Sequence, residues 1–313
     1  MKRIVMYTVV LIAGLLLFCC EDNSTNNNGN GDINVNGIYI AVGGNNRIIF
    51  MDDMTGAGWI AYGDSGSGIG KFIKPSGIDI GQDGKIYVVD GGNDRIVRID
   101  DMSGSGWVTY EIEGDGEGEF DFSWDSGRIV IGSDGKIYIL DNRNNRVVRI
   151  DDMTGTGWIT YGTEGDGEGE FDWPFGIDVG DDNEIYIADY GNARIVRIDN
   201  MTGEGWVSYN FGNPFNVALG PNGKIYMLSE RGVIGRIDHM TGTGWGSFGS
   251  DSEELFDEPT CIDIGIDNRI YIVDDNSRVI CIDDMSGSGW VEYGTDGSGI
   301  GEFDNSISIV VMP

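Results

Sequence analysis

A block that reads Asp-Asp-Met-Thr/Ser-Gly-x-Gly-Trp, with small variations, recurs six times along this chain of 313 residues. The copies end at Trp59, Trp107, Trp158, Trp206, Trp245 and Trp290. Repeats of roughly 40–50 residues are typical of solenoids and propellers, in which each copy packs on its neighbours. The spacing therefore predicts the architecture, whereas function has to be sought where the copies differ.

Each copy contains four short apolar segments. In the second copy these are Gly77–Ile80, Lys85–Asp90, Arg95–Asp100 and Trp107–Tyr110, separated by turns rich in Gly, Asn and Asp. Such segments predict four antiparallel strands. One small sheet cannot bury both of its faces, so the copies are expected to pack around an axis. We predict an all-β fold, a six-bladed β-propeller of four-stranded antiparallel blades.

The two ends of the chain predict how the ring closes. The first copy begins with Gly37–Ile40, which matches the second strand of the other copies. The missing first strand is found at the other end, where Phe303–Val311 repeats the pattern of Phe72–Ile80. We expect the C-terminal strand to join the N-terminal blade, because closure removes free sheet edges.

The segments Gly-x-Gly-x-Phe, Pro-x-Gly-Ile-Asp-Ile, Asp-Gly-Lys-Ile-Tyr-Val-x-Asp and Asn-x-Arg-Ile resemble the NHL repeat, over about residues 36–313. That family includes scaffolds, binding proteins and a few lyases, so the resemblance implies a fold more than an activity. It also implies Asp–Arg pairs in which the carboxylate caps a turn and binds the guanidinium. The pairs are Asp90/Arg95, Asp141/Arg146, Asp189/Arg194 and Asp274/Arg278. Blade one has Val42 in place of the Asp, and blade five has Ser229.

The first twenty residues differ from the rest. Two basic residues precede the apolar stretch Ile4–Phe18, which is followed by Cys19 and Cys20. The stretch is short for a transmembrane span. Residues 1–20 resemble a bacterial lipoprotein signal peptide, and we predict lipidation at Cys20, with Cys19 as the alternative residue. An uncleaved membrane anchor is the other interpretation.

Residues 21–35 are rich in Asn and Gly and contain few apolar side chains. Such a segment cannot bury enough apolar surface to offset its own ordering, which predicts a flexible tether. We therefore expect a propeller domain, residues 36–313, in the bacterial cell envelope. It would contact the membrane through the lipid anchor only and lie in the periplasm or on the cell surface.

Charge and histidine content narrow the function. The formal charge of −32 argues against nucleic acid as a partner, because phosphate binding needs clustered Lys and Arg. His239 is the only histidine, whereas propeller lyases and lactonases that resemble this fold use several. We predict a monomeric, non-enzymatic binding module for a protein, peptide or glycan. The acidic surface either attracts basic partners or serves only solubility.

Calcium is the alternative. Two Gly-rich segments place carboxylates at alternating positions, Asp115 and Glu117 in one and Asp166 and Glu168 in the other. Calcium prefers several such oxygen ligands, although this is not the twelve-residue calcium loop. The rival function is thus a calcium-dependent propeller hydrolase or lyase, and no other cofactor is expected.

Three aspartates share one position in the innermost strands of alternate blades: Asp79, Asp178 and Asp263. They could converge in the central channel and serve as metal ligands in the calcium-dependent alternative. Otherwise they would accept bonds from local backbone or from an arginine such as Arg98 or Arg197, since buried acids need partners.

Blade five differs most from the repeat. Between Ser229 and Arg236 it carries Glu230-Arg231-Gly232-Val233-Ile234, which suggests a turn lengthened from five to seven residues with exposed Val233 and Ile234. Loops that depart from a repeat often carry recognition, although drift in a shortened blade is the alternative. We predict a binding face made of Glu230, Arg231, Val233, Ile234, Tyr190 and Arg143.

Cys261 and Cys281 are the two cysteines of the predicted domain, on the first and third strands of blade six. An intervening strand would separate them by roughly 9–10 Å, beyond the reach of a disulfide. We expect two buried free thiols.

Overall fold

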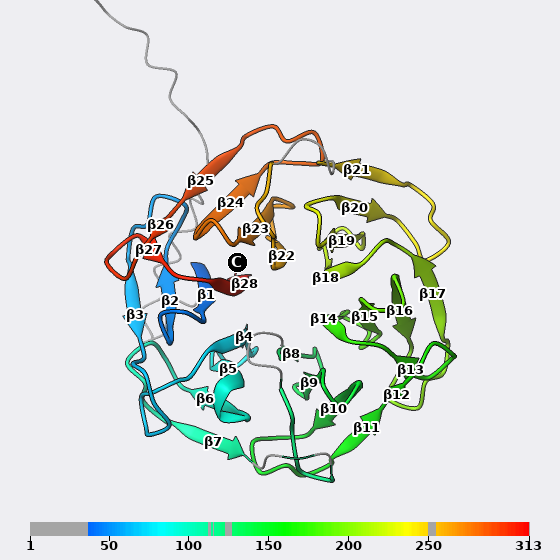
Figure 1. Ribbon diagram of the computed structural model, residues 1–313, viewed down its shortest axis with the longest axis horizontal. Helices are drawn as coiled ribbons and strands as arrows, with labels where there is room; N and C mark the ends of the chain where they lie inside the picture. Colours follow the sequence, from blue (N-terminus) through cyan, green and yellow to red (C-terminus); the bar gives the residue numbers. More distant parts are fainter. Residues whose placement is uncertain (1–36, 112–113, 115, 123–126, 250–254, 313) are drawn as a thin grey trace, which may run out of the picture.

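The computed structural model describes residues 37–312 except 112–113, 115, 123–126 and 250–254. Within this part of the chain, six four-stranded antiparallel sheets form a ring (Figure 1). The predicted six-bladed β-propeller is confirmed. The predicted signal peptide and tether lie outside the described residues. Across the described ranges, no helix has the length and apolar character needed to cross a bilayer.

The strands are best followed from the centre of the ring outward. The innermost strands are β4 (Pro75–Ile80), β8 (Arg128–Ile131), β14 (Pro174–Val179), β18 (Pro214–Leu219), β22 (Cys261–Ile264) and β28 (Ser306–Met312). The second strands are β1 (Gly37–Val42), β5 (Ile86–Asp90), β9 (Ile137–Asp141), β15 (Ile185–Asp189), β19 (Ile225–Ser229) and β23 (Ile270–Asp274). The third strands are β2 (Arg47–Met51), β6 (Arg95–Ile99), β10 (Arg146–Ile150), β16 (Arg194–Ile198), β20 (Ile234–Ile237) and β24 (Arg278–Ile282). The outermost strands are β3 (Ile60–Tyr62), β7 (Val108–Glu111), β11 (Ile159–Tyr161), β17 (Val207–Asn210), β21 (Gly246–Phe248) and β25 (Val291–Tyr293).

Short additional elements lie in the connections. Two parallel pairs join β12 (Thr163–Glu164) to β13 (Glu170–Phe171) and β26 (Thr295–Asp296) to β27 (Glu302–Phe303). A 3-10 turn, η1 (Gly91–Asn93), is the one helical element among the described residues.

The ring closes as predicted. The C-terminal strand β28 pairs antiparallel with β1, with Val310 opposite Tyr39 and Met312 opposite Gly37. The first blade therefore has the order β28-β1-β2-β3, so one end of the chain completes the sheet begun by the other.

The hydrophobic core lies between the blades. In β5, Ile86 and Val88 pack in a cluster shared with blade one, whereas Val89 packs in a cluster shared with blade three. Neighbouring side chains of a strand point to opposite faces of its sheet. Each blade therefore needs both neighbours, which is the physical reason for a closed ring.

Aromatic side chains join the blades near the rim. Phe72 lies between Tyr62 of blade one and Trp107 of blade two, with ring centroids 6.3 and 5.4 Å away. Comparable contacts recur at the other junctions, as between Phe171 and Trp206 at 5.7 Å. Such pairs stabilise beyond simple area burial. The repeated tryptophans thus mark the blade junctions.

The rest of the repeated block forms a tight turn. In blade two, the Asp100 amide donates to the Ser105 carbonyl (2.7 Å), and the Asp101 carboxylate accepts the Ser103 amide (2.8 Å). Gly106 has φ +63°, and a Cβ there would lie 2.2 Å from the Asp100 carboxylate. An Asp or Asn cap and a glycine with positive φ favour this turn, which accounts for the recurrence of these residue types in the blocks.

Cys261 and Cys281 are both buried and form no disulfide, as predicted. Cys261 opens β22 and Cys281 lies in β24, with β23 between them in the sheet. The intervening strand keeps the two thiols apart.

Candidate functional site

The two faces of the ring carry different connections. The turns between second and third strands and the Gly-rich connections between blades lie on one side, here called the loop face. The turns between first and second strands and the six repeated blocks lie on the other, the block face. This division follows from the antiparallel order of each sheet.

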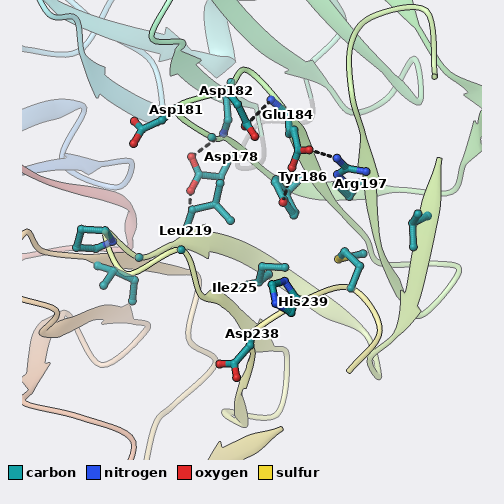
Figure 2. Close-up of a pocket in the computed structure, with 18 of the residues that line it drawn as sticks. Asp178, Asp181, Asp182, Glu184, Tyr186, Arg197, Leu219, Ile225, Asp238 and His239 are labelled. Carbon is teal, nitrogen blue, oxygen red and sulfur yellow. Dashed lines mark hydrogen bonds and ion pairs between the residues drawn. The ribbon is translucent and has the colours of Figure 1, made fainter. Parts of the chain in front are cut away.

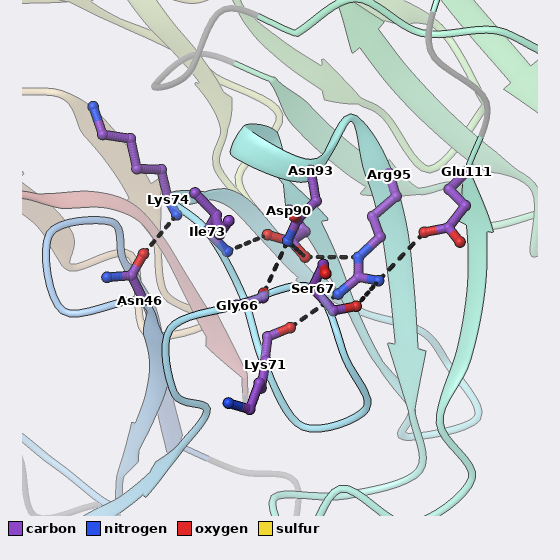
Figure 3. A network of polar contacts seen from close by, with 10 residues as sticks. All are labelled: Asn46, Gly66, Ser67, Lys71, Ile73, Lys74, Asp90, Asn93, Arg95 and Glu111. Atoms are coloured by element: carbon purple, nitrogen blue, oxygen red, sulfur yellow. Dashed lines mark hydrogen bonds and ion pairs between the residues drawn. The ribbon is translucent and has the colours of Figure 1, made fainter.

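On the loop face, the Asp–Arg pairs hold the Gly-rich connections (Figure 3). One Asp90 oxygen accepts the Ile73 amide, and the other accepts Asn93 and Arg95 Nε, with the ion pair at 2.7 Å. The Arg95 guanidinium also donates to the Ser67 and Lys71 carbonyls of the connection. Equivalent ion pairs form in blades three, four and six. The carboxylate caps and binds the guanidinium, as the family resemblance implied.

In blade five, the predicted lengthening of the turn is wrong. The Ser229 amide bonds the Val233 carbonyl (3.0 Å), and Ile234 lies opposite Leu228. Val233 therefore occupies the arginine position, and Arg236 corresponds to Arg98 of blade two. The turn is one residue shorter than in blade two. Ile234 is fully buried rather than exposed, because the apolar alternation of β20 fixes its register.

Blade five lacks both the paired arginine and the Gly-rich connection that such an arginine binds in blade two. Only residues 211–213 separate β17 from β18, so blade five has no Gly-rich connection for a guanidinium to bind. In blade one the connection is present, and Arg47 donates to the Ser298, Gly299 and Glu302 carbonyls although Val42 replaces the Asp. The arginine is therefore present where a long connection precedes the blade, whether or not the Asp is also present.

An aromatic cluster lies at this junction of blades four and five. Phe175 and Phe215 stack with centroids 4.9 Å apart and planes 6° apart. Tyr190 packs edge-on against both rings, at 5.1 and 5.5 Å. All three side chains are half-buried, and the Tyr190 hydroxyl donates to the exposed Glu230 carboxylate (2.8 Å). The cluster brings together two residues of the predicted binding face, Tyr190 and Glu230.

Backbone irregularities present these aromatic side chains. The pairing of β14 with β15 shifts between Pro174 and Gly176, and this bulge leaves Phe175 without a paired residue. Bulges re-aim side chains and are common beside functional sites. Trp173, just before β14, has φ 48° and is 49% exposed. Lys74 and Asn213, which precede the innermost strands of blades two and five, also have positive φ, so this backbone conformation belongs to the repeat. What distinguishes blade four here is the exposed tryptophan.

We name the aromatic surface by its six residues: Trp173, Phe175, Tyr190, Phe215, Glu230 and Arg231. Sequence reasoning missed three of them. The signal was available, since blades four and five have Phe where blade two has Ser76. Arg143, on the equivalent turn of blade three, pairs with Asp121 (3.5 Å), and Val233 is half-buried.

The channel aspartates bind backbone amides. Asp79 accepts the Ile80 amide (2.8 Å) and, from the next blade, the Ile131 amide (2.6 Å). Asp178 and Asp263 bond their own neighbour and the next blade in the same way. Arg98 and Arg197 pair with other acids. The backbone alternative therefore holds, and these three carboxylates join blade two to three, four to five and six to one.

Burial nevertheless disfavours the charged form of these acids. Loss of solvation raises the pKa of Asp79 to about 7, that of Asp178 to about 8 and that of Asp263 to about 6, against 3.8 for an ordinary aspartate. The amide bonds lower each pKa, but desolvation outweighs them. The three carboxyls line one small cavity of about 80 Å³ in the channel.

The proposed calcium segments face solvent. Glu117, Asp166 and Glu168 are exposed, and Asp115 lies outside the described residues. A further carboxylate in one segment, Glu170, instead accepts the Gly167 amide of its own turn (2.8 Å). Among the described residues, no three acidic, Cys or His side chains are grouped closely enough to hold a metal ion. Calcium binding stays a prediction.

A cavity of about 820 Å³ opens on the block face between blades four and five (Figure 2). Acids of the blade-four turn, Asp181, Asp182 and Glu184, line one side, and His239 lies across the cavity from them. Glu184 accepts the Tyr186 hydroxyl (2.9 Å) and pairs with Arg197. The cavity was not predicted, because its walls come from segments that are distant in sequence.

His239 is itself a departure from the repeat. In the other blocks its position holds Asp or Asn, and Asp101 and Asn200 illustrate how that side chain accepts an amide of its own turn (2.8 Å each). Histidine has replaced this cap in blade five. Its side chain is exposed and lines the cavity.

Comparison with known proteins agrees with this fold. Residues 171–198 match the NHL repeat, and no curated protein sequence matches the chain. Among solved structures, virginiamycin B lyase from Staphylococcus aureus is 20% identical, with 72% of each chain covered and a TM-score of 0.53. A streptogramin B lyase is 24% identical, covering 74% of this chain and 70% of its own, with the same TM-score. A chain of the nidogen/laminin complex is 15% identical, covering 88% and 97%, with a TM-score of 0.65.

At these identities the neighbours establish the fold and not an activity. They include both lyases and a component of a protein–protein complex. Together with the matched repeat and the ring of six blades, they bear out the resemblance found in the sequence. The chain is a six-bladed β-propeller in which residues 171–198 match the NHL repeat.

Proposed function

We propose that the propeller is a non-enzymatic binding module, and that the aromatic surface on its loop face recognises a peptide segment of another protein. The observation that carries the proposal is the stacked Phe175–Phe215 pair, half-buried at the loop-face ends of the innermost strands β14 and β18, beside the exposed Trp173. These side chains are apolar, yet they lie where the ring meets solvent.

The chemistry of the surface suits protein recognition. Aromatic residues and Arg dominate binding hot spots, since they offer a large contact area for a small loss of conformational freedom. Tyr190 is held by two rings and by Glu230, so it is already fixed before a partner arrives. The chain charge of −32 favours a basic partner segment through long-range attraction.

Two further facts support this proposal. The missing connection between β17 and β18 occurs at the junction where the aromatic surface lies. In addition, a propeller of similar fold is part of the nidogen/laminin complex. Neither fact identifies the partner of this chain.

The test is a selection from a displayed random peptide library on the full chain, followed by measurement of Kd for the enriched peptides. We expect basic peptides with an apolar anchor, and about tenfold weaker binding to the double variant Phe215→Ala, Tyr190→Ala. Ile159→Ala, at an exposed side chain of the outermost strand of blade three, away from the aromatic surface and the block-face cavity, is the control. Unchanged affinity in the folded double variant, or enrichment only from a glycan array, would refute the proposal.

We also propose that the protein is attached to the bacterial cell envelope by a lipid on Cys20. The support is the basic start, the short apolar stretch and the cysteine that follows it. Cys20→Ser is expected to prevent lipidation and release the protein in soluble form, seen by fractionation and mass spectrometry. A cleaved Cys20→Ser protein that stays in the membrane fraction would contradict this.

A further inference from the structure

The block-face cavity has the size and the mixed lining of a small-molecule site. Its volume of about 820 Å³ lies in the range typical of such sites. Leu219, Ile225 and Ile266 give it apolar walls, and Ile266 is 60% exposed. The cavity extends between blades four and five towards the channel, since Val311 of β28 also lines it.

The polar side of the cavity comes from a change in the repeat. The turn between first and second strands ends in a cation in blades two, three, five and six, at Lys85, Lys136, Lys224 and Arg269. Each of these cations pairs with a nearby aspartate, for instance Lys136 with Asp151 at 2.9 Å. Blade four has Glu184 at this position.

The same turn gains a further acid. Blade two reads Gly-Gln-Asp-Gly-Lys, with one acid and one base, whereas blade four reads Gly-Asp-Asp-Asn-Glu, with three acids and no base. Asp181 and Asp182 are exposed at the cavity. The cavity's one arginine, Arg197, is already paired with Glu184 and with Asp199. The excess charge at this cavity is therefore negative, and it is specific to blade four.

We infer that this cavity binds a small organic cation, an amine or guanidinium attached to an apolar body. The cationic group lies against Asp181 and Asp182, and the apolar body lies against Leu219, Ile225 and Ile266. Opposite charge favours such a ligand, and the partly enclosed apolar wall strengthens the attraction relative to open solvent. This site is separate from the aromatic surface, which lies on the opposite face of the ring.

The repeat supplies the variants for a test. Glu184→Lys restores the cation of blades two, three and five. Asp181→Ser with Asp182→Asn uses the residues of blades three and five, Ser133 and Asn222. Asn222 accepts the Lys224 amide as Asp182 accepts that of Glu184, so the second variant keeps the turn. Lys85→Glu in blade two is the matched control.

The probe is 4-phenylbutylamine, titrated into the full chain by ligand-observed NMR, with 4-phenylbutyrate as the anion of similar shape. We expect the amine to bind, with affinity that falls as salt rises. Each cavity variant should weaken binding about tenfold, and Lys85→Glu should leave it unchanged. Thermal midpoints show whether each variant folds. If Glu184→Lys does not fold, the Asp181/Asp182 variant alone serves as the test.

Three results would overturn the inference. One is equal binding of the butyrate, and another is unchanged amine affinity in the folded Asp181/Asp182 variant. The third is uptake of an oligolysine peptide without any uptake of the free amine, since that would assign the cavity to a macromolecule.

Discussion

Single buried carboxylates organise both the loop face and the channel of this ring. Asp90, Asp141, Asp189 and Asp274 have no exposed side-chain surface and bind an arginine that reaches the connection preceding its blade. Asp79, Asp178 and Asp263 instead bind amides of two blades. The first group joins connections to sheets, and the second joins sheets to each other.

Removing a carboxylate of the first group should be costly, because it leaves a largely buried guanidinium without its charge partner. We expect Asp189→Ala to lower the free energy of unfolding by about 3 kcal/mol, measured by urea denaturation. Asp166→Ala, at an exposed side chain of the connection that Arg194 holds, is the control and should change it little. Equal effects of the two substitutions would contradict the assigned role.

The channel acids should make stability depend on pH. Their pKa values of about 7, 8 and 6 lie above the 3.8 of an ordinary aspartate. From pH 3.8 up to these raised values, the folded protein therefore holds more protons than the unfolded chain. The stability contributed by the neutral carboxyls is fully present below pH 3.8 and is lost as pH rises through about 6 to about 8.

A triple variant with Asn at positions 79, 178 and 263 has no carboxyl groups at these positions to titrate. We expect its thermal midpoint to fall less than that of the wild type between about pH 5 and about pH 9. Parallel pH profiles for the two proteins would show that the three acids do not titrate in this range.

At the scale of elements, the turn of blade five combines a framework role with the proposed recognition of a peptide. Ser229–Val233 has the same length as Asp274–Arg278 of blade six, and Gly232 and Ser277 both have positive φ at the matching position. The two turns are therefore interchangeable in backbone terms, although their side chains differ.

Exchanging residues 230–231 for Asp-Asn, the blade-six sequence, keeps Gly232 at its positive φ and should leave the thermal midpoint unchanged. It removes Arg231 from the aromatic surface and shortens the side chain whose carboxylate accepts the Tyr190 hydroxyl. We expect selected peptides to bind about tenfold more weakly to this variant. The reverse exchange in blade six is the control, and equal affinity of both variants would exclude this turn from the binding site.

The elements also show what the sequence could predict. Strand positions, blade number and closure could be predicted from the alternation of apolar and polar residues and from the spacing of the tryptophans. Both patterns are visible in the sequence alone. The register of β20 could not be predicted in this way, because Arg236 looks like the paired arginine in the sequence. Blade five in fact lacks that arginine, and the shortened connection before β18 is the reason.

The sites were harder to predict than the strands. Phe175 and Phe215 stand forty residues apart, and their contact depends on how two blades pack. The block-face cavity likewise combines side chains of four blades, from Asp181 to Val311. Of the aromatic surface, sequence reasoning identified Tyr190, Glu230 and Arg231, through the irregularity of one turn.

At the scale of the whole molecule, stability depends on the closed ring. Deleting residues 305–313 removes β28, which pairs with β1 and contributes Ile309 to the core between blades six and one. We expect aggregation or a broad, less cooperative thermal transition, because the deletion exposes a sheet edge and an apolar face. A transition as sharp as that of the intact chain would rule out the closing strand as a stabilising element.

The proposed recognition takes place on the loop face at the junction of blades four and five. Hydrogen exchange measured with and without a selected peptide tests this location most directly. We expect slower exchange in residues 172–176, 189–192, 211–216 and 229–233, with the block face unchanged. Protection confined to the block face, or spread over the Gly-rich connections of other blades, would contradict it.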